Sequence, residues 1–166
     1  MTRTGSLILA ALAVLTAQGC GGDDVVGPRP PVDIVFATVL QGYYGTCADC
    51  DSSATEVVLL ADEGSWRSFW ERSVTEFATA PPPVVDFRHE VVLALLDKVE
   101  SQATWIEIAS VRRESDRIVV RATRTAVCWD PWLHWLAGDD WRPYHIVRIN
   151  RRVAPVDLHV TDVGCP

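Results

Sequence analysis

Four cysteines in the body of the chain are the residues with the clearest chemistry. Cys47 and Cys50 are separated by two residues, Cys128 stands alone, and Cys165 is the second residue from the end of the sequence. An even number of cysteines in an oxidising compartment predicts two disulfide bonds. Three pairings are possible, and the sequence does not choose among them. Cys165 could join the end of the chain to Cys128, which would leave Cys47 with Cys50.

The same thiols could instead act in redox chemistry or bind zinc. A redox role for Cys47 and Cys50 requires a thiol with a depressed pKa, usually at a helix N-terminus or beside cations. Asp49 and Asp51 are the charged neighbours here, and negative charge disfavours a thiolate. Zinc bound by all four thiolates is disfavoured because the second half of the chain has no matching Cys-x-x-Cys motif. We therefore expect disulfides, with no metal and no cofactor.

Tryptophans dominate one short segment and offer aromatic contacts. Four of the seven tryptophans lie in the segment CWDPWLHWLAGDDW, and they are Trp129, Trp132, Trp135 and Trp141. Two interpretations stay open for them. If buried, they would anchor a long loop against a sheet. If exposed, they would bind a partner protein, or stack on sugar rings while Asp139 and Asp140 accept hydrogen bonds from hydroxyl groups.

The spacing of the histidines and the absence of catalytic motifs argue against an enzyme. His89, His134, His145 and His159 are scattered and show no metal-binding spacing such as HExxH. The chain also has no GxSxG nucleophile motif, no phosphate-binding loop and no GxGxxG. Asp86 has no second carboxylate in a recognisable motif, so we interpret it as a turn residue. The sequence thus predicts a protein that is not an enzyme.

The N-terminus has the features of an export signal. Arg3 supplies a positive charge, and the apolar run Leu7–Ala17 is too short to span a bilayer as a permanent helix. The residues that follow lead into Cys20, which resembles the lipobox of bacterial lipoproteins, although Ala17 occupies the position where leucine is commoner. An ordinary secretory signal is the alternative. We expect residues 1–19 to be removed and acylated Cys20 to anchor the protein in the cell envelope, on the exported side of a bacterial membrane.

The remaining 147 residues (166 minus 19) carry 14 basic and 22 acidic side chains, which gives a net charge of −8. A chain with this negative charge has no general attraction for nucleic acid or for anionic lipid head groups. We therefore exclude nucleic-acid partners. About 150 residues is typical of one domain. We expect residues 20–32, rich in glycine and proline, to form a flexible tether and residues 33–166 to form a single globular domain.

Strands are the main elements that must position these residues. Apolar runs rich in β-branched residues predict strands at Asp33–Leu40, Glu56–Leu60, Glu90–Leu96, Thr104–Val111, Arg117–Val127, Tyr144–Ile149 and Val156–Val160. Aromatic residues at positions 66, 69 and 70 predict a helix over Ser65–Ser73, capped by Ser65 or by Asp62. We predict an α+β fold, a mainly antiparallel β-sheet with this one helix packed on it. An all-β sandwich is the alternative.

Several of these features follow one another in a recognisable order. They are a strand leading to a helix with Trp66 and Trp70, then Pro83-Val84-Val85-Asp86-Phe87, the apolar strands Val91–Leu95, Trp105–Ile108 and Ile118–Val120, and finally Pro143-Tyr144-His145-Ile146-Val147. This order, over about Glu56–Val160, resembles the C-terminal domain of the protease complex subunit PrcB and its relatives. Members usually have Gly-Gly-Tyr before the third strand, whereas this chain has Gln102-Ala103-Thr104-Trp105, so the turn there must differ.

The resemblance implies an exported, often lipid-anchored domain, named for an accessory subunit of a surface protease complex and without catalytic residues. Together with the signal at the N-terminus, it leads us to expect a binding protein that assembles with or stabilises another envelope or secreted protein, such as a protease. Carbohydrate or small-ligand binding through the tryptophan-rich segment is the alternative.

Overall fold

A computed structural model gives the fold, and it describes residues 30–44, 54–73, 81–98, 104–126 and 142–164. These residues form eight strands and one helix. The elements are β1 (Val32–Ile34), β2 (Phe36–Tyr44), β3 (Glu56–Leu60), α1 (Glu63–Ser73), β4 (Glu90–Leu96), β5 (Thr104–Glu114), β6 (Arg117–Ala126), β7 (Arg142–Asn150) and β8 (Val156–Val163). Over these ranges, no helix is both long enough and apolar enough to cross a membrane.

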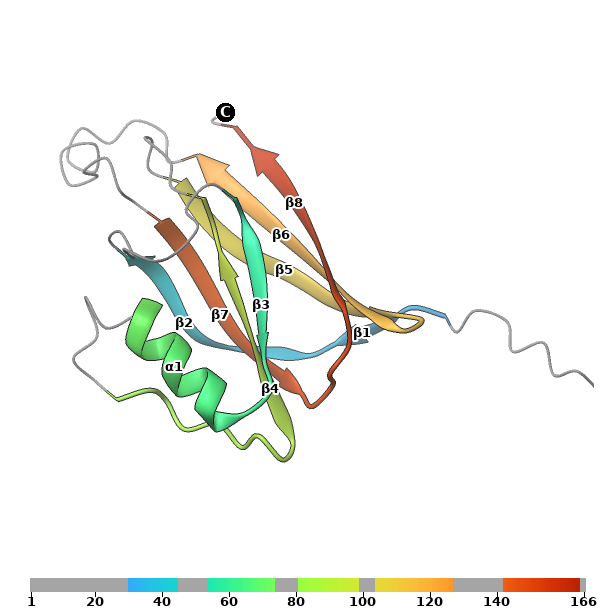
Figure 1. The fold of residues 1–166 in the computed structure, drawn as a ribbon. Helices are drawn as coiled ribbons and strands as arrows, with labels where there is room; N and C mark the ends of the chain where they lie inside the picture. The colour runs from blue at the N-terminus through green and yellow to red at the C-terminus, as the bar shows by residue number, and fades with distance from the viewer. Residues whose placement is uncertain (1–29, 45–53, 74–80, 99–103, 127–141, 165–166) are drawn as a thin grey trace, which may run out of the picture.

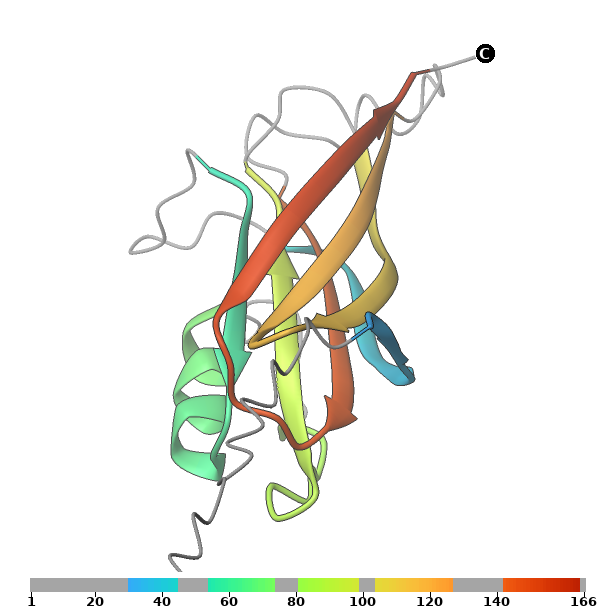
Figure 2. The same cartoon turned by 90° about the vertical axis from the view of Figure 1, so that its right-hand side faces the viewer.

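The strands form two four-stranded sheets that pack against each other (Figures 1 and 2). Sheet A has the order β1-β5-β6-β8, and sheet B has the order β2-β7-β4-β3. Neighbouring strands are antiparallel except for β6 and β8, which are parallel. One apolar cluster joins the sheets and includes Leu93 of β4 and Ile118 of β6. The fold is therefore mainly β, and the expectation of a largely antiparallel architecture is confirmed.

Helix α1 packs on the face of sheet B that points away from sheet A (Figure 1). Asp62 is its N-cap, because its carboxylate accepts a hydrogen bond of 2.8 Å from the backbone N–H of Ser65. Trp66, Phe69 and Trp70 are buried, as their helical spacing predicted, and form a second apolar cluster with sheet B. The helix begins at Glu63, two residues before the predicted start, because the cap is at Asp62.

Strand β4 is buried on both of its faces. Val92 and Ala94 belong to the cluster under α1, whereas Val91 and Leu93 belong to the cluster between the sheets. Since successive side chains of a strand point to opposite faces, a strand with both faces covered needs apolar residues throughout. This explains why the sequence EVVLALL lacks the usual alternation with polar residues.

The strand predicted at Asp33–Leu40 is two strands in the structure. β1 pairs with β5 in sheet A, and β2 pairs with β7 in sheet B, so the chain passes from one sheet to the other at Val35. Ile34 and Phe36, on either side of Val35, both pack against the cluster between the sheets, while Val35 itself is 85% exposed. The alternation of side chains therefore continues through the crossing, and only the hydrogen-bonding partner changes.

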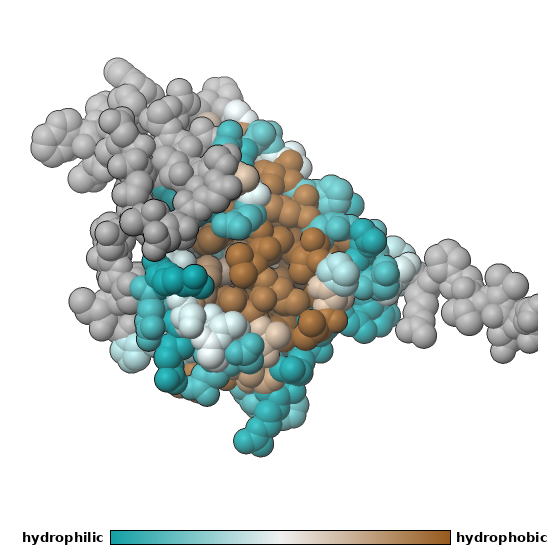
Figure 3. All heavy atoms as spheres, viewed as in Figure 1, coloured by the Kyte–Doolittle hydropathy of each residue, from teal (hydrophilic) through white to brown (hydrophobic). Residues whose placement is uncertain are grey.

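The two long sides of the molecule differ. On one side, the chain itself connects the sheets through β1 and β2. On the other side, the edge strands β3 and β8 lie side by side, and partly buried apolar residues of both strands line the gap. We call this strip the β3/β8 seam, and its residues are Val57, Leu59, Val156, Leu158 and Val160. Figure 3 shows a continuous hydrophobic surface over these two strands.

Candidate functional site

The predicted site residues lie outside the part of the chain that the structure describes. They are Cys20, Cys47, Cys50, Cys128, Cys165, Trp129, Trp132, Trp135 and Trp141. What the structure does give is the position of the strand ends to which the last eight of these residues are attached. The tryptophan segment, for example, leaves β6 after Ala126 and enters β7 at Arg142.

Those strand ends all lie at one end of the two sheets, which we call the loop-bearing end (Figure 1). In sheet B, Tyr44 pairs with Arg142 at the ends of β2 and β7, and Glu56 pairs with Leu96 at the ends of β3 and β4. In sheet A, Thr104 pairs with Ala126, and Thr125 pairs with Val163 near the end of β8. The connections 45–53, 99–103 and 127–141, and the last residues of the chain, therefore start and end close together.

A buried carboxylate, Asp97, lies at the centre of this end. Its side chain is fully buried and accepts hydrogen bonds from Nε and Nη2 of Arg124 at 2.7 and 2.5 Å. The hydroxyl of Thr55 donates to the same carboxylate at 2.6 Å, and so does the backbone N–H of Lys98 at 2.9 Å. Arg124 also pairs with Asp162 of β8 at 2.7 Å. The side chains thus link the ends of β4, β6 and β8 with the start of β3.

Arg142 extends the same network into β7. Its Nε donates to the backbone carbonyl of Asp97 at 2.5 Å, and its Nη2 pairs with Glu56 of β3 at 2.9 Å. The side chain of Arg142 is only 1% exposed. A buried arginine that holds both a carbonyl and a carboxylate fixes the position of two strand ends, because its planar fork allows little variation in geometry.

The electrostatics of this network favour the charged forms. The pKa of Arg124 is raised above its usual value, mainly because its side chain donates hydrogen bonds to Asp97, although burial acts in the opposite direction. Removing one member of a buried pair leaves the other charge unsolvated, so such pairs hold their geometry strongly. The network is therefore a rigid base for the three connections and the chain end.

A buried histidine joins the two sheets further from this end. His145 of β7 is 2% exposed, and its Nδ1 accepts a hydrogen bond of 2.8 Å from the backbone N–H of Ile108 in β5. Its Nε2 lies 3.0 Å from the hydroxyl of Thr38 in β2. Because a backbone N–H can only donate, the imidazole is neutral with its proton on Nε2. Burial lowers the pKa of His145, and the charge of Glu107 opposes that effect to a smaller degree.

The hydrogen bonds to β5 satisfy backbone groups at the part of its outer edge that no described strand covers. β1 pairs only with residues 111–113 of β5, so no described strand pairs with the outer edge of the first half of β5. Ile108 N–H donates to His145, and the carbonyl of Ile106 accepts from Nε2 of Gln41 at 3.1 Å. Irregularities in the strand pairing fall at the same place, between Thr38 and Leu40 and between Ile108 and Ser110. His145 is thus a structural link between the sheets.

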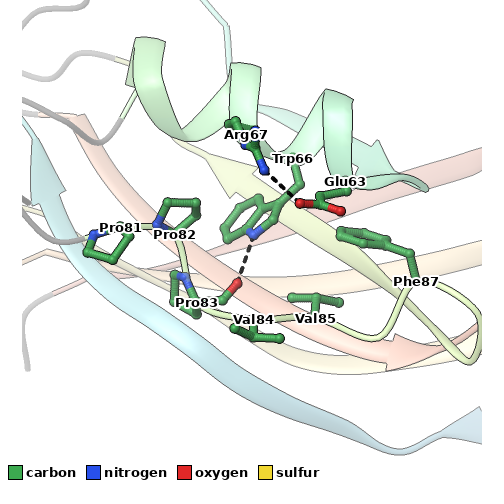
Figure 4. Close-up of a pocket in the computed structure, with 9 residues that line it drawn as sticks. All are labelled: Glu63, Trp66, Arg67, Pro81, Pro82, Pro83, Val84, Val85 and Phe87. Atoms are coloured by element: carbon green, nitrogen blue, oxygen red, sulfur yellow. Dashed lines mark hydrogen bonds and ion pairs between the residues drawn. The ribbon is translucent and has the colours of Figure 1, made fainter.

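A shallow hollow of about 420 Å³ lies between α1 and the segment before β4 (Figure 4). Trp66 forms its floor, and its indole N–H donates to the carbonyl of Pro83 at 3.1 Å. Glu63 and Arg67 of α1 pair with each other at 2.6 Å along its rim. The rest of the lining is apolar, and the one carboxylate is already paired, so the hollow offers contact area but no group placed for acid or base catalysis.

Asp86 is a turn residue, as its sequence context indicated. Its carboxylate accepts hydrogen bonds from the backbone N–H of Arg88 at 3.1 Å and from Nδ1 of His89 at 2.8 Å. These two bonds, with that from His89 first, lower the pKa of Asp86. Its carbonyl also accepts from the N–H groups of His89 and Glu90, which closes the turn into β4.

Sequence reasoning missed the network of Asp97, Arg124 and Arg142. One signal was present, because Asp97 directly follows the apolar run VVLALL, and a charge at the end of a buried strand needs a partner. The partner itself could not be identified, since Arg124 is 27 residues away and several other arginines were available. Within the described ranges, no three histidine, cysteine, aspartate or glutamate side chains are grouped as a metal site requires.

Comparison with known proteins gives no relative for this chain. No family model, no curated protein and no solved structure matches it.

Proposed function

We propose that this protein is a lipid-anchored, exported accessory protein that binds another envelope or secreted protein, with a protease as the leading candidate. The observation that carries the proposal is the buried network at the loop-bearing end. Asp97, Arg124 and Arg142 lock together the ends of β3, β4, β6, β7 and β8. Binding residues tend to lie on loops that a rigid scaffold positions, and this end has such a scaffold under the tryptophan segment.

The described polar groups support binding in preference to catalysis. Asp97 and Arg124 satisfy each other, and His145 uses both ring nitrogens to join the sheets. A general acid or base must instead be free to exchange a proton with a substrate. We accordingly assign no catalytic residue.

We also propose that the fold belongs to the α+β class and that the chain is PrcB-like. The class assignment is supported by α1, which contributes Trp66, Phe69 and Trp70 to one of the two apolar clusters. The family proposal rests on the resemblance in the order of sequence features over about Glu56–Val160.

Affinity capture from detergent-solubilised envelopes tests the proposed function. The bait is the full chain with Cys20 intact, and the comparison variant carries Trp132→Ala and Trp135→Ala. We expect one protein to co-purify in stoichiometric amount with the wild type and to be lost with the variant. An Arg67→Ala chain, altered on the exposed face of α1, is the matched control and should retain the partner.

Three results would contradict the proposal. Recovery of the bait alone would argue against a stable protein complex. Retention of the partner by the double variant would remove the tryptophan segment from the interface. If the wild type captures no protein but binds a glycan, and the normally folded double variant does not bind that glycan, carbohydrate binding would be favoured instead.

A further inference from the structure

Among the described residues, no strand pairs with the outer edge of β8, so this edge is open for hydrogen bonding. β8 is the last strand of sheet A, with β6 on its other side. The N–H of Ile118 in β6 donates to the carbonyl of Pro155 at 2.9 Å, and Ile118 pairs with Val156. In a parallel ladder this pattern turns the odd-numbered residues of β8 toward β6. The N–H and C=O groups of Val156, Leu158 and Val160 therefore point to the open edge.

The side chains of β8 divide between two faces. Val156, Leu158 and Val160 point into the β3/β8 seam, where they are only partly buried. Asp157 and His159 point to the opposite face, where the Asp157 side chain is 39% exposed and His159 is exposed. The open edge thus carries an apolar ladder on one face and an acid next to an imidazole on the other.

We propose that this edge binds a second copy of the chain, with the two β8 strands antiparallel and Leu158 opposite Leu158 of the second copy. Val156 then lies opposite the second copy's Val160, and Asp157 lies opposite the second copy's His159. Each apolar residue meets an apolar residue, and each carboxylate meets an imidazole. The two sheets A become one sheet of eight strands, and the seam of each copy is covered further.

Charge and hydrogen-bonding pattern together select this register. Because only even-numbered residues expose their backbone groups, the two-fold axis must pass through a residue and not between two residues. An axis through Asp157 would place the two Asp157 carboxylates opposite each other, which is unfavourable. An axis through His159 would place Asp162 opposite Val156. The axis through Leu158 avoids both contacts.

The contacts that Asp157 already makes are compatible with this arrangement. Nη1 of Arg117 pairs with Oδ2 of Asp157 at 2.7 Å, so Oδ1 remains available to an imidazole N–H of the second copy. An open edge strand of eight residues is a known liability in β-proteins, and pairing with an identical edge removes it. This interface does not involve the tryptophan segment, so its test is independent of the test of the proposed function.

Charge variants at His159 test the interface in the full chain. Sedimentation velocity in a density-matched detergent should give a dimer for the wild type and for His159→Lys, which keeps the attraction to Asp157. His159→Asp places two like-charged pairs in each dimer and should weaken dimerisation by about tenfold. Thr161→Asp adds the same charge to the same face opposite Pro155 of the second copy, and it should dimerise nearly as well as the wild type.

Amide hydrogen exchange supplies a second readout that folding defects cannot imitate. We expect slow exchange at Leu158 and Val160 in the wild type and faster exchange at these two amides in His159→Asp, with Asp157 and His159 amides unchanged because they face β6. A monomeric wild type would overturn the proposal. A dimer that His159→Asp and Thr161→Asp affect equally would overturn this register and edge.

Discussion

Asp97 shows how much a single residue contributes to the loop-bearing end. Its carboxylate is fully buried and receives two hydrogen bonds from Arg124. Such a charge is tolerated inside a protein only while its partners remain, because transfer from water into the interior is costly. The strand ends that carry the proposed binding segments therefore depend on a few side chains of the network.

Replacing Arg124 with methionine should expose this dependence. We expect a loss of about 3 kcal/mol in the free energy of unfolding, since Asp97 would be left as a buried charge without a cation. Urea unfolding followed by tryptophan fluorescence measures the change. Asp162→Asn is the matched control, because it removes the partner of Arg124 that is 72% exposed, and it should cost less than about 1 kcal/mol. Equal effects of the two substitutions would contradict a central role for Asp97.

His145 should make the stability of the domain sensitive to acid. Its pKa in the folded state is lowered by burial from an ordinary value of 6.5. Well above pH 6.5 the histidine is neutral in both states, so its contribution to stability is complete. As the pH falls below 6.5, the unfolded chain gains a proton that the folded protein does not, and stability is lost.

Denaturation midpoints measured on both sides of pH 6.5 test this expectation. The wild type should lose more stability on acidification than His145→Gln, which has no titrating group at this position. NMR titration of the imidazole should place its midpoint below 6.5. Identical pH dependence of the wild type and the variant would show that His145 does not contribute.

At the level of the elements, the sequence predicted most strands and the helix closely. β3 and β4 have the predicted bounds, because each is a run of mainly valine and leucine that begins with a glutamate. The crossing at Val35 was not predicted, since Ile34 and Phe36 keep the alternation of a single strand. Sheet order was also beyond the sequence, because it depends on pairs such as Phe36 with Ile149 that no local pattern encodes.

The candidate site was predictable only in part. The composition of the cysteine and tryptophan segments marked them as unusual, but their residues lie outside the described ranges. The network beneath them depends on contacts between distant strands, such as Arg142 with Glu56, which lie 86 residues apart. Local patterns identify the apolar faces of strands but not which charges meet at their ends.

The parallel pairing of β6 and β8 favours one of the three possible disulfide arrangements. Thr125 pairs with Val163 in the described strands. Cys128 follows Thr125 by three residues in the sequence and Cys165 follows Val163 by two, and both cysteines lie outside the described residues. Paired strands are about 4.8 Å apart, so the points where residues 127 and 164 continue from the described pairing start close together, and a disulfide joins Cα atoms at about this separation. We expect Cys128 to pair with Cys165, and therefore Cys47 with Cys50.

Peptide mapping without reduction should recover these two pairs. The bridge from Cys128 to Cys165 encloses 37 residues, from 165 minus 128, and its loss should cost about 4 kcal/mol in a chain-entropy estimate. Cys128→Ser should thus be much less stable than Cys47→Ser, whose bridge closes a very short loop. Recovery of a Cys47 to Cys128 peptide would contradict the arrangement.

For the whole molecule, charge is distributed unevenly along its length. Residues 45–53, 99–103 and 127–141 at the loop-bearing end contain no lysine or arginine, although Lys98 directly precedes the second range. Their acidic residues are Asp49, Asp51, Glu100, Asp130, Asp139 and Asp140. The cations that the structure places at the base of these segments include Arg124 and Arg142, which already pair with carboxylates. The composition of these segments is therefore acidic, and in the proposed function they are the ones that meet the partner.

The proposed partner should accordingly present a basic surface, and its binding should weaken with salt. Charges that steer association are screened beyond about 10 Å at 0.1 M salt. We expect capture to fall steeply when the wash is raised to high ionic strength. Asp139→Asn with Asp140→Asn should reduce both the binding and its dependence on salt. Binding that is unchanged by salt would indicate an apolar interface centred on the tryptophans.

The connectivity of the sheets also has a consequence for the order of events in biogenesis. β1 can pair only after β5 has been made, and β2 must wait for β7, which lies 113 residues further along from Phe36 to Ile149. Strand pairs this far apart in the sequence form slowly, because the entropy cost of closing a long loop comes before any stabilising contact is made. The backbone hydrogen bonds of the first two strands therefore cannot form until most of the chain has been synthesised. A nascent chain of this topology leaves its first strands unpaired for longer, which would be an advantage under the proposed export, since a polypeptide crosses a membrane before it folds.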